Sequence, residues 1–588
     1  MRKAVYSFLF IGALSLAGCQ LPKMVKMSKD QQLTVTPNPL EAHKDTVAFD
    51  MAANLPAKML KKGYSYTVNT YYKYGEQEQA LEPIVFKGDD YPNSATEQPK
   101  VTKNFSFAYS PAMRTGVLEV EGVAAKGTKS KTTPRMQIAT GVITTSKLVK
   151  PVYFAAYADH GYNNQEELEP IVIPDFIFEQ GRAVLRTSEV RSTKGKQLDA
   201  FIASKNATRT VTITGTHSPE GAERINSRLS PDRAAAIEKY YRQQMKRYDY
   251  KGLADSVKFI LKPVIQDWNE FKTALAGYNG ITSEQKSEYL NIVNSGGSFE
   301  QTEKQLQKLG TYRQVFRDVY PILRTAKTEI LTIKEKKTDA EIAVLSKQIT
   351  QGANADTLSL EELMYGATLT PSLEEKAAIY EAATKKGTNW NAHNNLGAVY
   401  IAQAIETPAN AAALADKAIA QLQIASKLKD APEVNANLAS AQLLKGNAYA
   451  AYDYASKASG LSGDNAAGLN GVKAASEIYL AKYADAVRSA SAASDNADNL
   501  FNKGLAQILN KDYQNALTSF REATSKDNNH AAAWYGAAIA SARLGNADDV
   551  VSNLTNAVKA DPNLKQSALG DLEFAKFAAS EPFRNALK

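Results

Sequence analysis

The residues with the clearest chemical potential lie together between Gly215 and Ala234. The loop 215–221 reads Gly-Thr-His-Ser-Pro-Glu-Gly, and the segment after it carries Asn226 and Arg233. An arginine guanidinium can hold a carboxylate through two parallel hydrogen bonds, a carboxylate can hold an ammonium group, and the N–H groups at a helix start favour an anion. We therefore interpret this segment as a candidate binding site for charged groups.

Catalysis is not indicated by the sequence. His217 stands beside Ser218, but neighbours in sequence rarely face each other productively, and no third orienting group is evident. A single cysteine excludes an intrachain disulfide framework and zinc sites built from several thiolates. The sequence also lacks a phosphate-binding loop, a Gly-x-Ser-x-Gly elbow and a His-Glu-x-x-His motif. We expect no enzyme, no metal and no cofactor, and we interpret His217 as an exposed loop residue.

The elements that must position the loop alternate between strands and helices. Alternating apolar residues predict strands at 171–178, 209–215 and 257–262 and around 320–330. A helix is expected at 194–205 and a second one at about 222–246. The second has an apolar stripe formed by Ile225, Leu229, Ala236, Ile237 and Tyr240. The charged stretch 268–315 is expected as a mainly helical insertion with a flexible turn at 295–298. The class of this region is α/β or α+β.

This region resembles the OmpA-like peptidoglycan-binding family. The residues that carry the resemblance are Asn226, Leu229, Ser230, Arg233 and Ala234, in the family's order and spacing. The resemblance covers about 171–265 and closes with the strand near 320–330. It implies a peptidoglycan ligand whose diaminopimelate zwitterion gives its carboxylate to Arg233, while Asn226 holds the loop.

The loop departs from the family at the position of its acid. Ser218 stands where the family has an aspartate, so the ligand's ammonium group loses its charge partner. Glu220 is a candidate substitute, although it also fits a solvated turn. Two alternatives stay open: the domain still binds peptidoglycan through Ser218, Glu220, Asn226 and Arg233, or it keeps the fold without the ligand and Arg233 pairs with a nearby surface acid.

The N-terminus predicts export and lipid attachment. Two basic residues precede an apolar run from Phe8 to Leu16, which is too short to span a bilayer. The sequence Leu-Ala-Gly-Cys that ends at Cys19 resembles the bacterial lipoprotein signal, which implies that Cys19 becomes the acylated first residue. Gln20 favours outer-membrane sorting, with the body in the periplasm. The alternative is a plain signal peptide with an incidental cysteine.

Residues 33–150 predict a small antiparallel β-sandwich. The alternation has period two at 64–71, 104–109 and 117–123, and turn residues separate these segments. Aromatic residues on such strands are usually part of a core, so we favour a core role over a binding face.

Residues 339–588 predict an all-α solenoid. Alanine and leucine become frequent, and aromatic and small residues recur at about 34 residues, a spacing typical of tetratricopeptide (TPR) repeats. The last two units fit best, with Gly504, Tyr513, Ala516, Phe520 and Ala523, then Trp534, Ala538, Gly545, Leu554, Ala557 and Pro562. Small residues at Ala439, Gly504 and Ala538 allow close helix packing, and Phe520 and Leu554 fill the gap between repeats. An alanine-rich helical bundle is the alternative.

Composition agrees with a folded, multidomain chain. Of 588 residues, 44% are hydrophobic and 22% charged, and the net charge is only +8, which does not favour a nucleic-acid partner. The expected parts are a signal peptide (1–18), a lipidated linker (19–32), the β-sandwich (33–150), the OmpA-like domain (151–338) and the TPR region (339–588).

Two functions follow from these parts. The first is an outer-membrane-anchored periplasmic scaffold that tethers the outer membrane to peptidoglycan through its OmpA-like domain and binds outer-membrane or periplasmic proteins through its TPR repeats. The second is an accessory subunit of an outer-membrane assembly or secretion complex, in which the OmpA-like domain has become a docking element. A cell-wall hydrolase is disfavoured, because no acid pair or metal cluster can be assembled.

Overall fold

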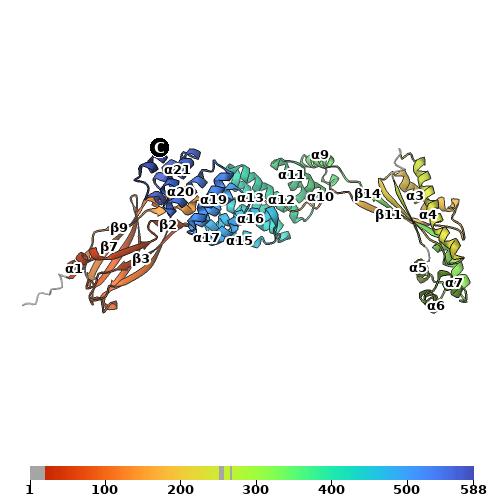
Figure 1. Cartoon of the computed structure of the whole chain (residues 1–588), viewed down its shortest axis with the longest axis horizontal. Helices are drawn as coiled ribbons and strands as arrows, with labels where there is room; N and C mark the ends of the chain where they lie inside the picture. Colours follow the sequence, from red (N-terminus) through yellow and green to blue (C-terminus); the bar gives the residue numbers. More distant parts are fainter. Residues whose placement is uncertain (1–19, 251–256, 265–267) are drawn as a thin grey trace, which may run out of the picture. The chain divides into compact units, whose positions relative to one another are not determined.

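The chain folds as two compact units. The computed structural model describes residues 20–250, 257–264 and 268–588 (Figure 1). Unit 1 combines Met1–Tyr162 with Asp339–Lys588, and unit 2 comprises Asn163–Thr338. Unit 2 is therefore inserted into the sequence of unit 1, and the β-rich N-terminal region and the C-terminal helices form one unit rather than two separate domains.

The N-terminal region of unit 1 is a sandwich of two sheets. The first sheet has the order β1 (Gln32–Thr36), β3 (Thr46–Asn54), β2 (Leu40–His43) and β10 (Val142–Ile143), with β6 (Lys100–Ala108) beside β3. The second has the order β5 (Gln77–Lys87), β4 (Ser65–Tyr74), β7 (Val117–Lys126) and β8 (Lys129–Thr132), with β9 (Met136–Thr140) beside β7. All pairs are antiparallel except β2 with β10. The predicted strands are confirmed.

The aromatic residues of these strands form the core of the sandwich. Tyr66 and Tyr72 of β4 alternate with half-buried neighbours and are fully buried. Tyr72 packs on Phe107 of β6, in the other sheet, with ring centroids 4.9 Å apart. The core role expected for the aromatic residues is thereby confirmed.

Residues 20–27, expected as part of a linker, form helix α1 (Gln20–Met27). Leu21 and Met24 lie on one face of this helix and are buried in the sandwich core. The sandwich therefore begins directly after position 19, which lies outside the described residues.

The C-terminal part of unit 1 is an array of helices. It begins with α9 (Asp339–Thr350), α10 (Leu360–Gly366) and α11 (Leu373–Thr384). Antiparallel pairs follow: α12 (Trp390–Glu406) with α13 (Ala411–Leu428), α14 (Pro432–Leu444) with α15 (Ala448–Lys457), α16 (Gly463–Tyr479) with α17 (Tyr483–Ser491), α18 (Ala497–Leu509) with α19 (Tyr513–Lys526), and α20 (Ala531–Leu544) with α21 (Ala547–Ala560). Short helices α22 (Leu564–Leu569) and α23 (Glu581–Ala586) close the array.

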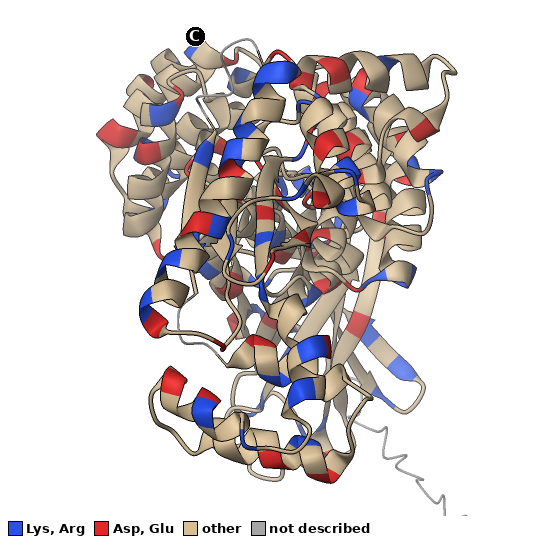
Figure 2. Cartoon of the chain, turned by 90° about the vertical axis from the view of Figure 1, so that its right-hand side faces the viewer, with Lys and Arg blue, Asp and Glu red and all other residues tan. Residues whose placement is uncertain are grey.

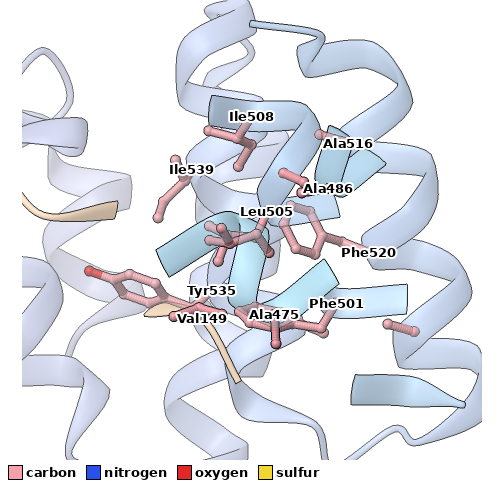
Figure 3. Close-up of a cluster of buried hydrophobic side chains, with 14 of the residues drawn as sticks. Val149, Ala475, Ala486, Phe501, Leu505, Ile508, Ala516, Phe520, Tyr535 and Ile539 are labelled. Atoms are coloured by element: carbon pink, nitrogen blue, oxygen red, sulfur yellow. The ribbon is translucent and has the colours of Figure 1, made fainter. Parts of the chain in front are cut away.

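Close packing between successive pairs depends on small residues. Phe520 of α19 is fully buried, as Figure 3 shows within its cluster. It lies between Gly504 of α18 and Gly536 of α20. A Cβ atom added to Gly504 would lie 2.8 Å from the Phe520 ring, and one added to Gly536 would lie 2.6 Å from it. The predicted helical-repeat region and the predicted packing of Phe520 are confirmed.

A partly buried charge cluster joins the sandwich to the array. Arg543 of α20 donates through Nη2 to Glu41 of β2 and to Glu573, at 2.9 Å in both cases, and its Nε donates to the second oxygen of Glu573. Thr145 donates to Glu573 at 2.6 Å, and the His43 ring bonds the Tyr483 hydroxyl at 2.7 Å. Because residues from both parts complete one network, the sandwich and the array are held in a fixed arrangement.

Unit 2 is built on a mixed four-stranded sheet. Its order is β11 (Leu168–Ile177), β14 (Thr325–Ile333), β12 (Thr208–Gly215) and β13 (Lys258–Pro263), and only β12 and β13 are parallel. The helices α2 (Thr187–Val190), α3 (Thr193–Ala203) and α4 (Glu223–Arg247) belong to this layer, and α3 and α4 contact the sheet. The last strand starts at Thr325, because 320–323 forms a 3-10 turn rather than a strand.

The insertion before the last strand is helical, as expected. It contains α5 (Asn269–Gly277), α6 (Ser283–Asn294), α7 (Phe299–Leu306) and α8 (Tyr312–Asp318). These helices enclose a core of their own around Phe271, Tyr289 and Tyr320. The expected turn between α6 and α7 has positive φ angles at Gly296 and Gly297, a conformation that glycine adopts without strain.

The apolar stripe predicted for α4 is correct only in its second half. Ile237 and Tyr240 are buried, but Ile225 is 50% exposed. In the first half the buried face carries Asn226 and Arg233 instead, because this end of the helix faces backbone carbonyls of the loop that precedes it and of residues 179–182. Polar side chains are buried there because they hydrogen-bond to that backbone.

Acidification should loosen the contact between the sandwich and the array. Burial alone would raise the pKa of Glu41, but hydrogen bonds and charge from His43 and Arg543 lower it from 4.5 to about 2. Ionised Glu41 therefore stabilises the fold fully above pH 4.5, and this contribution is lost as the pH falls toward 2.

We expect Glu41→Gln to lower the free energy of unfolding at pH 7 by an amount on the order of 1–3 kcal/mol. Thermal unfolding of the full chain measures this loss as a lower unfolding temperature. The difference from the wild type should shrink steadily between pH 5 and pH 3. A difference that stays constant over this range would contradict the assignment, and Glu121→Gln, on strand β7, serves as a control.

Candidate functional site

The loop that the sequence singles out lies between β12 and α4 in unit 2, and it is buried. Thr216, His217 and Ser218 are each less than 9% exposed. His217 is not the exposed loop residue that we expected: its ring lies edge-on to Phe299 of α7, with ring centroids 5.5 Å apart. Burial in this contact lowers the pKa of His217. The helical insertion therefore covers the loop.

Arg233 is occupied by the protein's own backbone. Its side chain is 1% exposed and lies over the Phe178 ring. The guanidinium donates through Nη1 to the carbonyl of Thr216 at 2.7 Å, through Nε to that of Arg182 at 3.1 Å and through Nη2 to that of Glu179 at 3.2 Å. Burial lowers the pKa of Arg233 to about 10, with a further contribution from the nearby Arg324. The carboxylate-binding atoms of this residue thus brace the loop from inside.

The candidate acid is also paired within the protein. Arg324, which directly precedes β14, donates to the Glu220 carboxylate at 2.7 Å and to the Ser218 hydroxyl at 3.0 Å. The side chains of Glu220 and Arg324 are about 10% exposed. Asn226 donates to the carbonyl of Glu220 at 3.0 Å and so holds the loop.

The fold thus brings Ser218, Glu220, Asn226 and Arg233 together, but in a closed network. Sequence reasoning missed Arg324 and Phe299, which close it. Both are distant from the loop in sequence, and neither belongs to a motif that would have drawn attention to it.

A second site lies in unit 1, on the helical array. Residues 149–162, which we call the strap, run as irregular, extended chain across the first helices of successive pairs. The sequence analysis assigned 151–162 to the central domain, but they belong to unit 1. The array therefore already holds a polypeptide segment, and that segment is part of the same chain.

Three asparagine side chains bind the strap backbone, each through two hydrogen bonds. Asn502 accepts from the N–H of Lys150 at 3.0 Å and donates to its carbonyl at 2.7 Å. Asn437 pairs in the same way with Ala156, at 2.7 Å for both bonds, and Asn395 with Ala158, at 2.7 and 3.0 Å. A carboxamide offers one acceptor and a donor group, so it can satisfy both polar groups of one residue.

Two further side chains complete the contact with the backbone. Ser440 accepts from the N–H of Phe154 at 3.1 Å, and Asn394 donates to the carbonyl of Ala156 at 3.0 Å. Asn437 also donates to Asn394, so the carboxamides form a connected network. Every amide named here belongs to an even-numbered strap residue, as expected for an extended chain whose alternate residues face one side.

The side chains of the strap complete the cores of the array. Val149 and Ala156 are buried in its largest hydrophobic cluster, and Figure 3 shows Val149 beside Ala475 and Tyr535. The array is shaped for this segment: a Cβ atom added to Gly468 of α16 would lie 2.2 Å from the Phe154 ring.

The sequence contained a signal for this site that we did not use. Asn394, Asn395, Asn437 and Asn502 are almost fully buried in helices rich in alanine. Asparagine is a poor helix former, and a buried carboxamide needs partners, so its recurrence on the first helices indicates a bound backbone.

In Figure 2 the basic and acidic residues are interspersed along the described helices and strands. Nucleic-acid-binding proteins usually carry a one-sided basic face instead. Among the described residues, no group of three His, Cys, Asp or Glu side chains is placed to hold a metal ion.

Comparison with solved structures gives likenesses at low identity, to TPR proteins and also, over 95% of this chain, to Salmonella alpha-2-macroglobulin (10% identity, 27% of that chain, TM-score 0.12). No family model matches the chain, and a search of curated proteins finds no match either. Among solved structures, the chain is similar to the APC/C hetero-tetramer Cut9-Hcn1 (12% identity, 60% of this chain and 64% of that one, TM-score 0.31). It is also similar to PilW, a type IV pilus biogenesis factor (18% identity, 42% and 99%, TM-score 0.27), and to YrrB, a TPR protein (16% identity, 40% and 100%, TM-score 0.23).

The match to Cut9-Hcn1 spans less than two thirds of the solved chain. All four TM-scores lie below 0.5, so the repeat architecture rests on the helix pairs of this chain themselves.

Loss of Arg233 should destabilise unit 2. Arg233→Ala leaves three carbonyls without their donor in a buried place, and we expect it to lower the free energy of unfolding of this unit by about 3 kcal/mol or more. Arg228→Ala, at an exposed position of the same helix, is the matched control and should change little. Urea titration followed by hydrogen exchange at the amides of β12 and α4 measures the effect; equal stability of the two variants would show that Arg233 does not brace the loop.

Proposed function

We propose that this protein is an outer-membrane-anchored periplasmic scaffold that acts as an accessory subunit of an envelope protein complex. Its array of TPR-like repeats organises the chain and offers surfaces to protein partners. Cys19 carries the lipid anchor, and the OmpA-like unit 2 serves as a docking element rather than a peptidoglycan grip. The observation that carries the proposal is the repeat array itself, which holds an extended polypeptide through side chains directed at its backbone.

The arrangement of unit 2 supports the loss of wall binding. The motif residues lie on a loop and helix in the order that the OmpA-like resemblance implies, but the guanidinium of Arg233 is already paired. To take a diaminopimelate carboxylate, Arg233 would have to give up three backbone carbonyls. Glu220 is already paired with Arg324 through Oε1, and only its buried Oε2 has no hydrogen-bond partner. Breaking such buried charged contacts costs several kcal/mol, which a ligand would have to supply.

Lipid attachment is supported by the N-terminal sequence. Helix α1 starts at Gln20, immediately after Cys19, and packs into the sandwich. Among the described helices, none is both long and apolar enough to cross a membrane. An acyl group on Cys19 would hold the sandwich close to the bilayer surface.

Purified peptidoglycan should not sediment the protein. We expect the full chain with Cys19→Ser, produced without its signal peptide, to stay in the supernatant over diaminopimelate-type peptidoglycan, while an OmpA-like domain that binds the wall pellets in parallel. Saturable pelleting would contradict the proposal. The pelleting would then be measured with Glu220→Gln, which removes the negative charge beside Arg324, and a change in pelleting would assign the ligand to this loop.

The anchor is tested separately. Cells that express the wild-type chain should incorporate labelled palmitate into it, and the chain should fractionate with outer membranes. Cys19→Ser should abolish both, because the only thiol of the sequence is removed. A Cys19→Ser chain that stays in the outer-membrane fraction would show that something other than the acyl group holds it there.

A further inference from the structure

We propose that the inner face of the helical array is a binding site for extended peptides, and that the strap occupies this site in cis and closes it to peptides from partners. The proposal deepens the scaffold function above by naming what fills the repeat surface. Its test uses only the purified chain and a peptide, so its failure is distinguishable from a failure of anchoring or of partner binding.

The contacts are of the kind used for bound peptides. Asn395, Asn437 and Asn502 each bind the N–H and the carbonyl of one strap residue, as a neighbouring strand would. Such bonds are indifferent to the identity of the bound side chain, so they supply affinity for any extended backbone. The strap forms no helix or strand of its own and lies across the first helices of the array.

Specificity comes from the side chains that alternate along the strap. Ala156 is fully buried in the hydrophobic core of the array, so a larger or charged residue does not fit at this position. Gly468 leaves space that the Phe154 ring fills, and Gly471 lies against Val152, with 3.2 Å between its added Cβ and the valine. The site therefore fits a peptide with an aromatic residue followed, two positions later, by a small one.

Covalent linkage explains why the strap is the occupant. It joins the sandwich, which the Arg543 cluster fixes to the array, to residues that pack near α10, so both of its ends are held in unit 1. A tethered segment acts at an effective concentration of about 1 mM or more. A free peptide of 10 μM intrinsic affinity would be weakened about 100-fold against such a competitor.

The first experiment measures binding of a fluorescent peptide with the sequence of residues 149–162 to the full chain. Wild-type chain should show no binding at micromolar concentrations. The double variant Phe154→Asp/Ala156→Asp cannot seat its strap, because it would bury two carboxylates, and it should bind the peptide. Tyr157→Asp, at a position 39% exposed, is the matched control and should behave as the wild type.

The bound position is then checked with asparagine variants. In the double variant, the additional change Asn437→Ala should weaken binding of the peptide at least about tenfold, since the bound amide loses its partner and the bound carbonyl loses one of its two donors. Asn470→Ala, on α16 and without a bond to the strap, should not. A folded double variant that binds no peptide would overturn the proposal, and so would a wild-type chain that binds it equally well.

If the double variant does not fold, hydrogen exchange in the native chain tests whether the array holds the strap backbone. The amides of Phe154, Ala156 and Ala158 should exchange as slowly as those of the helices below them, and Asn437→Ala should accelerate the exchange at Ala156 while Asn470→Ala leaves it unchanged. Strap amides that exchange in the wild type as fast as the exposed turn at 126–128 would overturn the proposal.

Discussion

The pairing of asparagine carboxamides with the strap backbone is the interaction on which unit 1 depends. An extended segment that forms no sheet has unpaired N–H and carbonyl groups, and burying them without partners would cost more than its apolar side chains return. Asn395, Asn437 and Asn502 remove this cost at three positions. The strap can therefore be buried, and its buried side chains join hydrophobic clusters that belong to different helix pairs.

Unit 2 shows the same principle with charged groups. Arg233 and Arg324 are buried at one loop and donate hydrogen bonds within the protein, Arg233 to backbone carbonyls and Arg324 to Oε1 of Glu220. A site that binds a charged ligand must leave such groups poorly satisfied until the ligand arrives. Here backbone carbonyls of Thr216, Glu179 and Arg182 occupy the Arg233 guanidinium, and the insertion around Phe299 covers the loop.

The sequence predicted elements whose patterns are local. The period-two strands of the sandwich, the alternation in unit 2 and the repeat spacing around Phe520 all follow from side chains that pack against near neighbours in the chain. The sequence did not predict contacts between residues that lie far apart along the chain. Arg324 is paired with Glu220 across 104 residues, and Ala156 with Asn437 across 281. The prediction that Ile225 belongs to a buried stripe was wrong for the same reason. The backbone that buries the polar face of α4 is itself held by residues far away in the sequence.

The insertion of unit 2 into unit 1 follows from where the strap ends. Tyr162, the last strap residue in unit 1, stacks on Tyr365 of α10 with ring centroids 5.0 Å apart, and the Tyr365 hydroxyl donates to Asp339, where the chain re-enters the array, at 3.1 Å. The point where the chain leaves unit 1 and the point where it returns thus both contact the side chain of Tyr365. A domain placed between two adjacent points adds little loop-closure entropy and leaves the contacts of its host intact. The strap therefore has two physical consequences: it fills the inner face of the array, and it brings the chain to a place where the 176 residues of unit 2 are inserted without separating the sandwich from the helices that hold it.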